Sequence, residues 1–111
     1  MYTVSFSASE VTVAGHTWRV PFPISQAVVA GERVLILYDY MAGPRHRQFQ
    51  NLEAFTLDGV RLWTAEHPTS TTVDSYVSIT SVSPLRVSSF AGYDCALNIE
   101  SGRLLDTVFT K

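Results

Sequence analysis

Alternation of apolar and polar residues predicts that this chain is built from short β-strands. In residues 51–66, apolar and polar side chains alternate up to Asp58-Gly59, so the two faces of an extended segment have different character. Asp-Gly supplies the positive φ of a tight primed turn, and the alternation resumes after it as far as Trp63. The glycine and the β-branched neighbours disfavour a helix. Residues 51–66 are therefore predicted to form a β-hairpin.

The same pattern recurs along the chain, interrupted by glycine, proline or clusters of polar residues. Residues 34–38 form a continuous apolar run, which predicts a strand covered on both faces at the centre of the core. No stretch shows a sustained helical period with caps, so no long helix is expected. The remaining strands are predicted at residues 2–7, 10–13, 17–20, 26–30, 33–40, 76–82, 85–91, 95–99 and 103–109.

Composition favours a single globular domain. The chain has 111 residues, of which 46% are hydrophobic and 16% charged, and this balance argues against disorder. A net charge of −2 disfavours a nucleic-acid partner or an anionic membrane surface. Cys95 is the only cysteine, so an intrachain disulfide is excluded. With no signal sequence and no apolar run of about 20 residues, we expect a cytoplasmic protein.

Two segments repeat one another. Residues 54–63 and 96–105 share the order Ala, apolar, polar, apolar, acidic, then a glycine-containing turn and Arg-Leu-apolar. Repeats near this spacing are typical of propeller blades, each a small antiparallel sheet. The segments resemble the repeats of quinoprotein-type (PQQ-like) β-propellers, in which a strand carrying Ala-Leu-Asp leads through a glycine turn into Leu-Leu-Trp. That resemblance implies blade-like sheets and, in active members, calcium and a quinone at the centre of the ring.

The chain is too short to close such a ring, because propellers use four to eight blades of about 40 residues. Two architectures remain open. The hairpins form a small sandwich or stack of sheets that buries its own faces, or further copies complete a ring. The chain lacks the adjacent cysteine pair of some quinoproteins and an evident acidic calcium cluster, so no cofactor is expected.

Two polar loops, residues 41–48 and 67–75, are the predicted recognition elements. Arg45, His46 and Arg47 form a basic cluster in the first loop, which suits an acidic partner surface or a phosphate; the alternative is a mobile charged loop.

Three further residues are candidates for binding. Asp74 and Tyr76 stand at the junction between the second loop and the next strand. Trp18 is expected to fill the space between adjacent sheets, whereas an exposed Trp18 would mark a binding patch.

The remaining reactive residue types do not form a catalytic or metal-binding pattern. His16, His46 and His67 fall in or beside different turns, and each is predicted to be a solvated loop histidine rather than part of a metal site. Cys95 lies in a strand pattern and is predicted to be a buried, inert thiol. No Gly-x-Ser-x-Gly elbow or phosphate-cradling glycine loop is present, so we predict that the protein is not an enzyme.

The sequence therefore predicts an all-β, non-catalytic binding or interaction module. Its partner would be another protein or a second copy of the chain. The small size and acidic charge are analogous to those of inhibitor or immunity-type proteins. A remnant or subunit of a quinoprotein-like propeller, or a self-assembling structural subunit, is the alternative.

Overall fold

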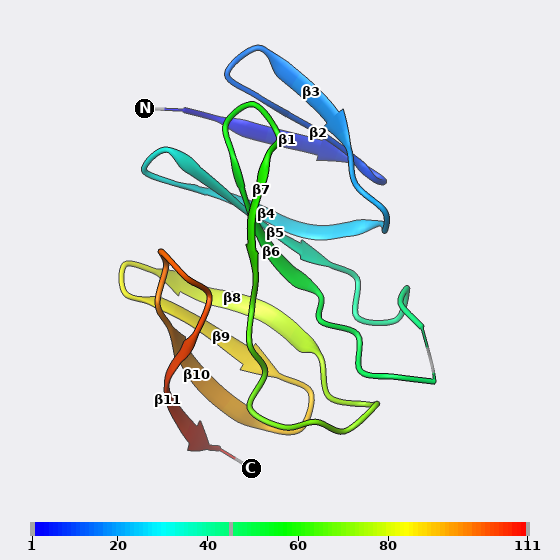
Figure 1. Ribbon diagram of the computed structural model, residues 1–111, viewed down its shortest axis with the longest axis vertical. Coiled ribbons are helices and arrows are strands. Elements are labelled where there is room, and N and C mark those ends of the chain that lie inside the picture. Colours follow the sequence, from blue (N-terminus) through cyan, green and yellow to red (C-terminus); the bar gives the residue numbers. More distant parts are fainter. Residues whose placement is uncertain (1, 45, 111) are drawn as a thin grey trace.

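Three antiparallel sheets are stacked along the long axis of the molecule (Figure 1). The computed structural model describes residues 2–44 and 46–110. Within each sheet, every strand pairs with its neighbour in the chain, so each sheet is a meander, and none of the three closes into a barrel. The prediction of an all-β fold is confirmed. In the described part of the chain, no helix has the length and apolar character needed to cross a membrane.

The strand boundaries agree closely with the predicted ones. Sheet 1 contains β1 (Val4–Ser7), β2 (Glu10–Val13) and β3 (His16–Arg19). Sheet 2 contains β4 (Ile24–Ala30), β5 (Arg33–Tyr38), β6 (Leu52–Thr56) and β7 (Arg61–Thr64). Sheet 3 contains β8 (Tyr76–Val82), β9 (Leu85–Ser89), β10 (Tyr93–Leu97) and β11 (Leu104–Phe109), with β8 and β11 at its edges.

The central sheet is covered on both faces, and its strand β5 shows why. Val34, Ile36 and Tyr38 belong to the core shared with sheet 1, while Leu35 and Leu37 belong to the core shared with sheet 3. All five side chains are buried. Because side chains alternate along a strand, a strand between two cores must be apolar at every position. The prediction that this apolar run lies at the centre of the core is therefore confirmed.

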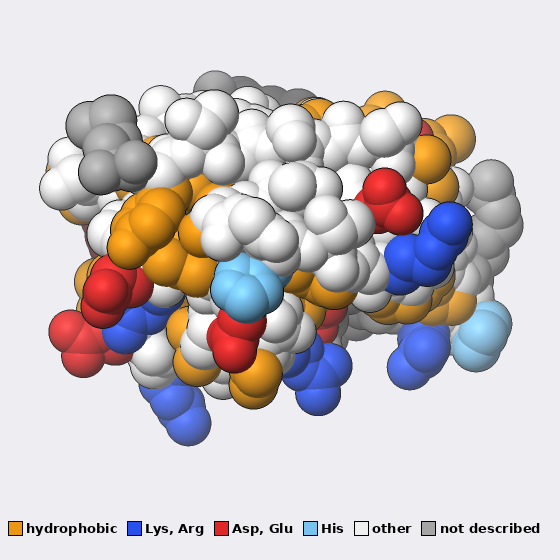
Figure 2. All heavy atoms as spheres, turned by 90° about the horizontal axis from the view of Figure 1, so that it is seen from above, with side chains coloured by type: hydrophobic (Ala, Val, Ile, Leu, Met, Phe, Trp, Pro, Cys, Tyr) orange, Lys and Arg blue, Asp and Glu red, His pale blue; other side chains and the backbone are white. Residues whose placement is uncertain are grey.

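Sheet 1 turns a polar face outward. The cross-strand pairs Ser5–Thr12 and Thr12–Thr17 lie on the face opposite the buried Val11 and Val13. Figure 2 views this end of the molecule, where uncharged polar groups and backbone cover most of the middle and charged side chains lie toward the rim. This face therefore resembles a solvated surface rather than a face prepared for another sheet.

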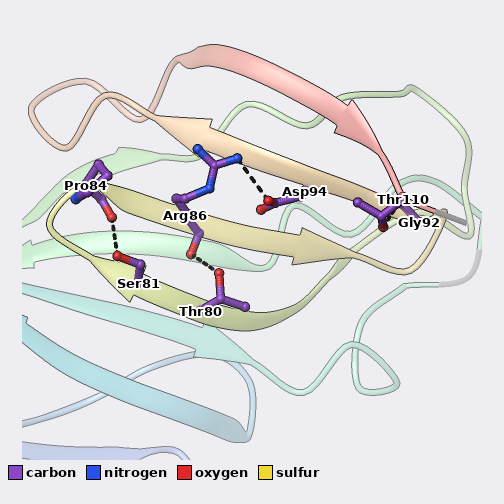
Figure 3. Close-up of polar contacts among 7 residues, drawn as sticks. All are labelled: Thr80, Ser81, Pro84, Arg86, Gly92, Asp94 and Thr110. Carbon is purple, nitrogen blue, oxygen red and sulfur yellow. Dashed lines mark hydrogen bonds and ion pairs between the residues drawn. The ribbon is translucent and has the colours of Figure 1, made fainter.

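Sheet 3 also ends the stack with polar side chains. Arg86 on β9 donates to the Asp94 carboxylate on β10 over 3.0 Å (Figure 3). Ser78 pairs with Ser88 in the neighbouring register position, opposite the buried Val87 and Cys95. The chain therefore forms a stack of three sheets, with its apolar side chains between the sheets and polar side chains on the outer faces of sheets 1 and 3.

The hairpin of β6 and β7 forms with a different turn from the predicted one. A hydrogen bond from the Thr56 amide to the Val60 carbonyl encloses three residues, 57–59. Gly59 has a φ of 94°, whereas a primed two-residue turn would require positive φ at Asp58 as well. The prediction of a primed two-residue turn was therefore wrong. The glycine instead ends a three-residue loop, the arrangement that accompanies a bulge in the hairpin ladder.

Candidate functional site

The two long loops of the molecule meet around an apolar hollow. In the structure the first loop extends over residues 39–51 and joins β5 to β6, and the second extends over residues 65–75 and joins β7 to β8. Both run along the same end of the sheets in Figure 1. We call the space between them the loop hollow. It has a volume of about 240 Å³, and its apolar lining comes from Tyr40, Met41, Phe49, Val73 and Phe90.

The rim of the loop hollow exposes large apolar side chains. Val73 is 69% exposed and Met41 58% exposed. The rings of Tyr40 and Phe90 stack with their centroids 5.8 Å apart, although they come from different sheet connections. Phe49 is buried beneath them and forms the floor. Clustered apolar side chains at a concave surface are typical of protein-binding sites.

A close approach of backbone to ring shapes the floor. A Cβ placed on Gly43 would lie 2.1 Å from the Phe49 ring, so the loop backbone rests directly against the aromatic side chain. Only glycine permits such an approach. The first loop is thereby held over Phe49.

Asp74 holds the second loop in place. Its Oδ2 accepts a hydrogen bond of 2.5 Å from the Thr69 hydroxyl, and its Oδ1 accepts one of 3.1 Å from the Ala91 amide. Asp74 is fully buried, and a buried carboxylate is stable only when its oxygens are paired in this way. Its role in this structure is to fix the loop against the turn between β9 and β10.

Hydrogen bonds also join the two loops directly. The Gln48 side-chain amide donates to the Thr69 carbonyl over 2.7 Å, and the Ser75 hydroxyl donates to the Phe49 carbonyl over 2.9 Å. The Phe90 amide donates to the Ser75 carbonyl. Long loops with such internal bonds lose less entropy when a partner binds. The walls of the loop hollow are therefore organised before any contact is made.

Asn51 connects this site to the sheets. Its side-chain amide donates to the carbonyls of Tyr38 and Tyr76, and its oxygen accepts from the Tyr76 amide. The Tyr76 hydroxyl donates to the Glu66 carbonyl over 2.6 Å. Burial is the main cause of a raised pKa for Tyr76, so its hydroxyl stays protonated and donates this hydrogen bond.

The structure places the predicted site residues in different surroundings. His46 and Arg47 are exposed on the first loop, as expected of a basic cluster, while Arg45 lies outside the described residues. Asp74 and Tyr76 are both fully buried; they position the second loop and do not face a partner.

Trp18 lies outside the loop hollow. It packs between sheets 1 and 2, with its ring centroid 6.0 Å from that of Phe55. This is the inter-sheet position that we expected for it.

The apolar rim was not identified by sequence reasoning. Tyr40, Met41, Val73 and Phe90 stand in loops or turns that are otherwise polar. The sequence does show that these segments contain large apolar residues. It does not show that the residues lie side by side, because that depends on how the three sheets stack.

A second hollow, of about 260 Å³, shares Phe49 with the loop hollow and includes Glu53, Arg61 and Arg47. The Glu53 carboxylate accepts hydrogen bonds from the Tyr38 hydroxyl at 2.7 Å and from Arg61 at 3.3 Å. The Thr64 hydroxyl donates to it as well, over 2.6 Å. With its oxygens engaged by these three donors, Glu53 holds β5, β6 and β7 together.

The expectation of a solvated His67 was wrong. His67 is 8% exposed, and its ring centroid lies 4.2 Å from that of Tyr76. Its Nδ1 is 3.2 Å from the Ala65 carbonyl oxygen. Burial lowers the pKa of His67, because desolvation disfavours the charged imidazolium. His16 and His46 are exposed, as predicted.

The thiol of Cys95 is buried in the core between sheets 2 and 3. Burial raises its pKa to about 11, so the thiolate that would act as a nucleophile is disfavoured at neutral pH. The prediction of a buried cysteine is confirmed. Within the described residues, no group of three or more His, Cys, Asp or Glu side chains is placed to hold a metal ion.

Comparison with known proteins places the chain in one family. The model of a family described as "Domain of unknown function (DUF7957)" matches residues 1–109. No curated protein matches the sequence.

Proposed function

We propose that this chain, which belongs to the DUF7957 family, is a non-catalytic binding module that recognises another protein through the loop hollow. The observation that carries the proposal is an exposed apolar rim on loops that buried polar side chains hold in place. Met41 and Val73 are largely exposed at this rim, while Asp74 and Asn51 anchor the loops from within. Exposed apolar groups on a preorganised scaffold favour association.

The size of the loop hollow supports a protein partner. Its volume of about 240 Å³ falls below the range of about 300–1,000 Å³ that is usual for small-molecule and cofactor sites. It suits one or two apolar side chains projecting from a partner surface. Tyr40 and Phe90 would provide flat aromatic contacts, and Met41 would adapt its shape to the inserted group.

Charge suggests what surrounds the inserted side chain. His46 and Arg47 are exposed on the first loop, so carboxylates beside the apolar group would gain charge-assisted hydrogen bonds at the rim. We therefore propose a partner that presents an apolar side chain flanked by acidic residues.

We propose that the protein is not an enzyme, because its potentially reactive side chains are engaged in structural hydrogen bonds or buried in the core. Asp74 and Glu53 use their carboxylate oxygens to hold loops and strands. Cys95 is buried with a raised pKa. Residues engaged in this way are poorly suited to general acid–base or nucleophilic chemistry. The unpaired cysteine also supports a reducing compartment, such as the cytoplasm.

The alternatives have less support. Completion of a ring by stacking further sheets would bury the polar outer faces of sheets 1 and 3, including the Arg86–Asp94 pair, at a desolvation cost. The quinoprotein-like alternative depends on the sequence repeats, and the loop hollow adds nothing to it.

Site-directed photo-crosslinking tests the proposal. A photoreactive residue at Val73 should crosslink a protein in native lysate. The same residue at Val60, which is 59% exposed against 69% for Val73 and lies on the turn between β6 and β7, is the matched control and should not. Equal crosslinking at both positions, or none at Val73, would contradict recognition through the loop hollow.

The captured partner then allows a quantitative test with purified proteins. The double variant Met41→Ser/Val73→Ser should bind at least about tenfold more weakly by calorimetry, because it removes the apolar rim. The double variant Val60→Ser/Leu62→Ser removes exposed apolar groups elsewhere and should bind like the natural sequence. Equal affinities for the two variants would refute the proposal.

A further inference from the structure

Strand β11 forms an open edge of sheet 3. It pairs with β10 on one side and is the last strand in the sheet order, as Figure 3 shows. Three of its apolar side chains are exposed, with fractions of 66% for Leu105, 47% for Val108 and 58% for Phe109. Strand edges of this kind readily pair with another strand.

The direction of the backbone groups on β11 follows from the ladder. The Thr110 amide donates to the Gly92 carbonyl on the β10 side over 2.8 Å. Because backbone groups alternate along an antiparallel strand, those of Val108 and Asp106 also point toward β10. The amide and carbonyl groups of Thr107 and Phe109 therefore point away from the sheet, where a further strand could bind them.

Two other edge strands, β8 and β1, are covered by residues of another sheet. At the edge of β8, the Gln26 side chain donates to the Ile79 carbonyl and accepts from the Ile79 amide, which satisfies the backbone in place of a strand. Strand β1 lies against β4. No other sheet covers β11 among the described contacts; it has one charged residue, Asp106, and a bulge at Leu105, and it has neither lysine nor proline.

We propose that β11 pairs antiparallel with β11 of a second copy. The two copies are related by a two-fold axis that passes between their Thr107 residues. In this register each Thr107 faces its equivalent and Asp106 faces Val108, within the part of β11 that follows its bulge at Leu105. A register centred on Asp106 would instead place two carboxylates opposite each other, which is destabilising. The dimer joins two four-stranded sheets into one continuous sheet.

The pairing is a weak, concentration-dependent one. Two strands of six residues cover less surface than the about 1,200–2,000 Å² of a stable interface. A contact that uses the same patch on both copies closes at two chains, so it does not propagate into fibres.

Introducing a charge at position 107, beside the symmetry axis, tests this dimer. Sedimentation of the natural chain over a rising concentration series should show a mass that increases from 12.3 kDa toward twice that value. Thr107→Lys and Thr107→Glu each place like charges face to face and should remain monomeric. An equimolar mixture of the two variants should form a heterodimer, because the opposed charges then attract.

Thr17, an exposed threonine on the edge strand β3, provides the matched control. Thr17→Lys should dimerise like the natural chain, and circular dichroism should show that every variant keeps its β-sheet. A natural chain that stays monomeric at the highest concentration would overturn the proposal. So would a dimeric Thr107→Lys variant, or a mixture of the charged variants that does not associate.

Discussion

The two interfaces between sheets share one packing unit and differ in how it is fixed. Trp18 on β3 covers Gly59 in the turn of sheet 2, and Trp63 on β7 covers Gly102 in the turn of sheet 3. In both places a large ring from the last strand of one sheet rests on a glycine of the next. Since a glycine lets the ring approach the backbone closely, this repeated unit sets the spacing of the stack.

The polar contacts at the two interfaces are different. The Trp63 indole donates to the Ile99 carbonyl over 2.9 Å, whereas the Trp18 indole nitrogen is buried without a partner among the described residues. Gln26 and Asn51 bind the backbone of β8 from sheet 2. Within the described part of the chain, a backbone hydrogen bond from the Ile24 amide to the Ala8 carbonyl joins sheet 2 to sheet 1, but no side-chain hydrogen bond does.

This difference indicates how each contact acts. Apolar burial brings sheets together without fixing their relative position, while satisfied buried polar groups specify one arrangement. We therefore expect sheet 1 to separate at a lower free energy than sheets 2 and 3, as a unit of local unfolding. The loop hollow lies at the more firmly fixed interface.

The largest effect is expected from Asn51→Ala. The change leaves the buried carbonyls of Tyr38 and Tyr76 and the Tyr76 amide without their partner, and each unsatisfied group costs about 1–3 kcal/mol. Urea denaturation should show a loss of roughly 3–5 kcal/mol. Gln26→Ala, which affects a part-buried site, should cost about 1–2 kcal/mol. A smaller loss for Asn51→Ala than for Gln26→Ala would contradict the comparison.

Next come alanine substitutions at the two glycines beneath the tryptophans. A Cβ on Gly102 would lie 2.4 Å from the Trp63 ring, and one on Gly59 would lie 2.8 Å from the Trp18 ring. Both positions also have positive φ. Because Trp63 is held by its indole hydrogen bond, we expect a loss of about 3 kcal/mol at Gly102 and about 2 kcal/mol at Gly59.

Gly15 separates strain from steric overlap in this experiment. It has a φ of 80°, but a Cβ there would meet nothing within 4 Å. Gly15→Ala should therefore cost only the conformational strain, about 1 kcal/mol. An equal loss of stability for the three substitutions in thermal denaturation would show that overlap with the tryptophan rings adds nothing to their cost.

A smaller difference is expected between the tryptophans themselves. Trp63→Phe leaves the Ile99 carbonyl without its donor, whereas Trp18→Phe removes a donor that has no partner. The first change should destabilise the protein by about 1–2 kcal/mol more than the second. The measurement is the difference in unfolding free energy by urea denaturation, and Trp18→Phe costing as much as Trp63→Phe would exclude a role for the hydrogen bond.

Local sequence patterns predicted the strands and the central position of residues 34–38, because these depend on side-chain alternation alone. They also indicated that tryptophans fill the spaces between sheets. The polar connections could not be predicted in the same way. Asn51 and Tyr76 are 25 residues apart, and Gln26 and Ile79 are 53 apart, so their contacts exist only after the sheets have stacked.

The candidate site shows the same limit. His46 and Arg47 were identified as exposed because charge marks a loop surface. Tyr40 and Phe90 became part of a rim only because the turn of sheet 3 lies beside the first loop. His67 looked like a solvated loop residue, yet the second loop folds its ring onto Tyr76.

The smallest expected effect is a dependence on pH through His67. Burial lowers its folded-state pKa below the usual 6.5, so between these two pKa values the unfolded chain binds more protons than the folded one. The free energy of unfolding should therefore fall as the pH falls through this window, and it should be retained above pH 6.5.

Because His67 packs on Tyr76 at the interface between sheets 2 and 3, acid should weaken this interface and so reduce its advantage in stability over the interface between sheets 1 and 2. Urea midpoints at pH 7 and pH 5 measure this, with His67→Phe showing a smaller acid loss than the natural chain. His16→Gln, which changes an exposed histidine, should keep the full loss, and an unchanged acid loss in His67→Phe would exclude His67 as its source.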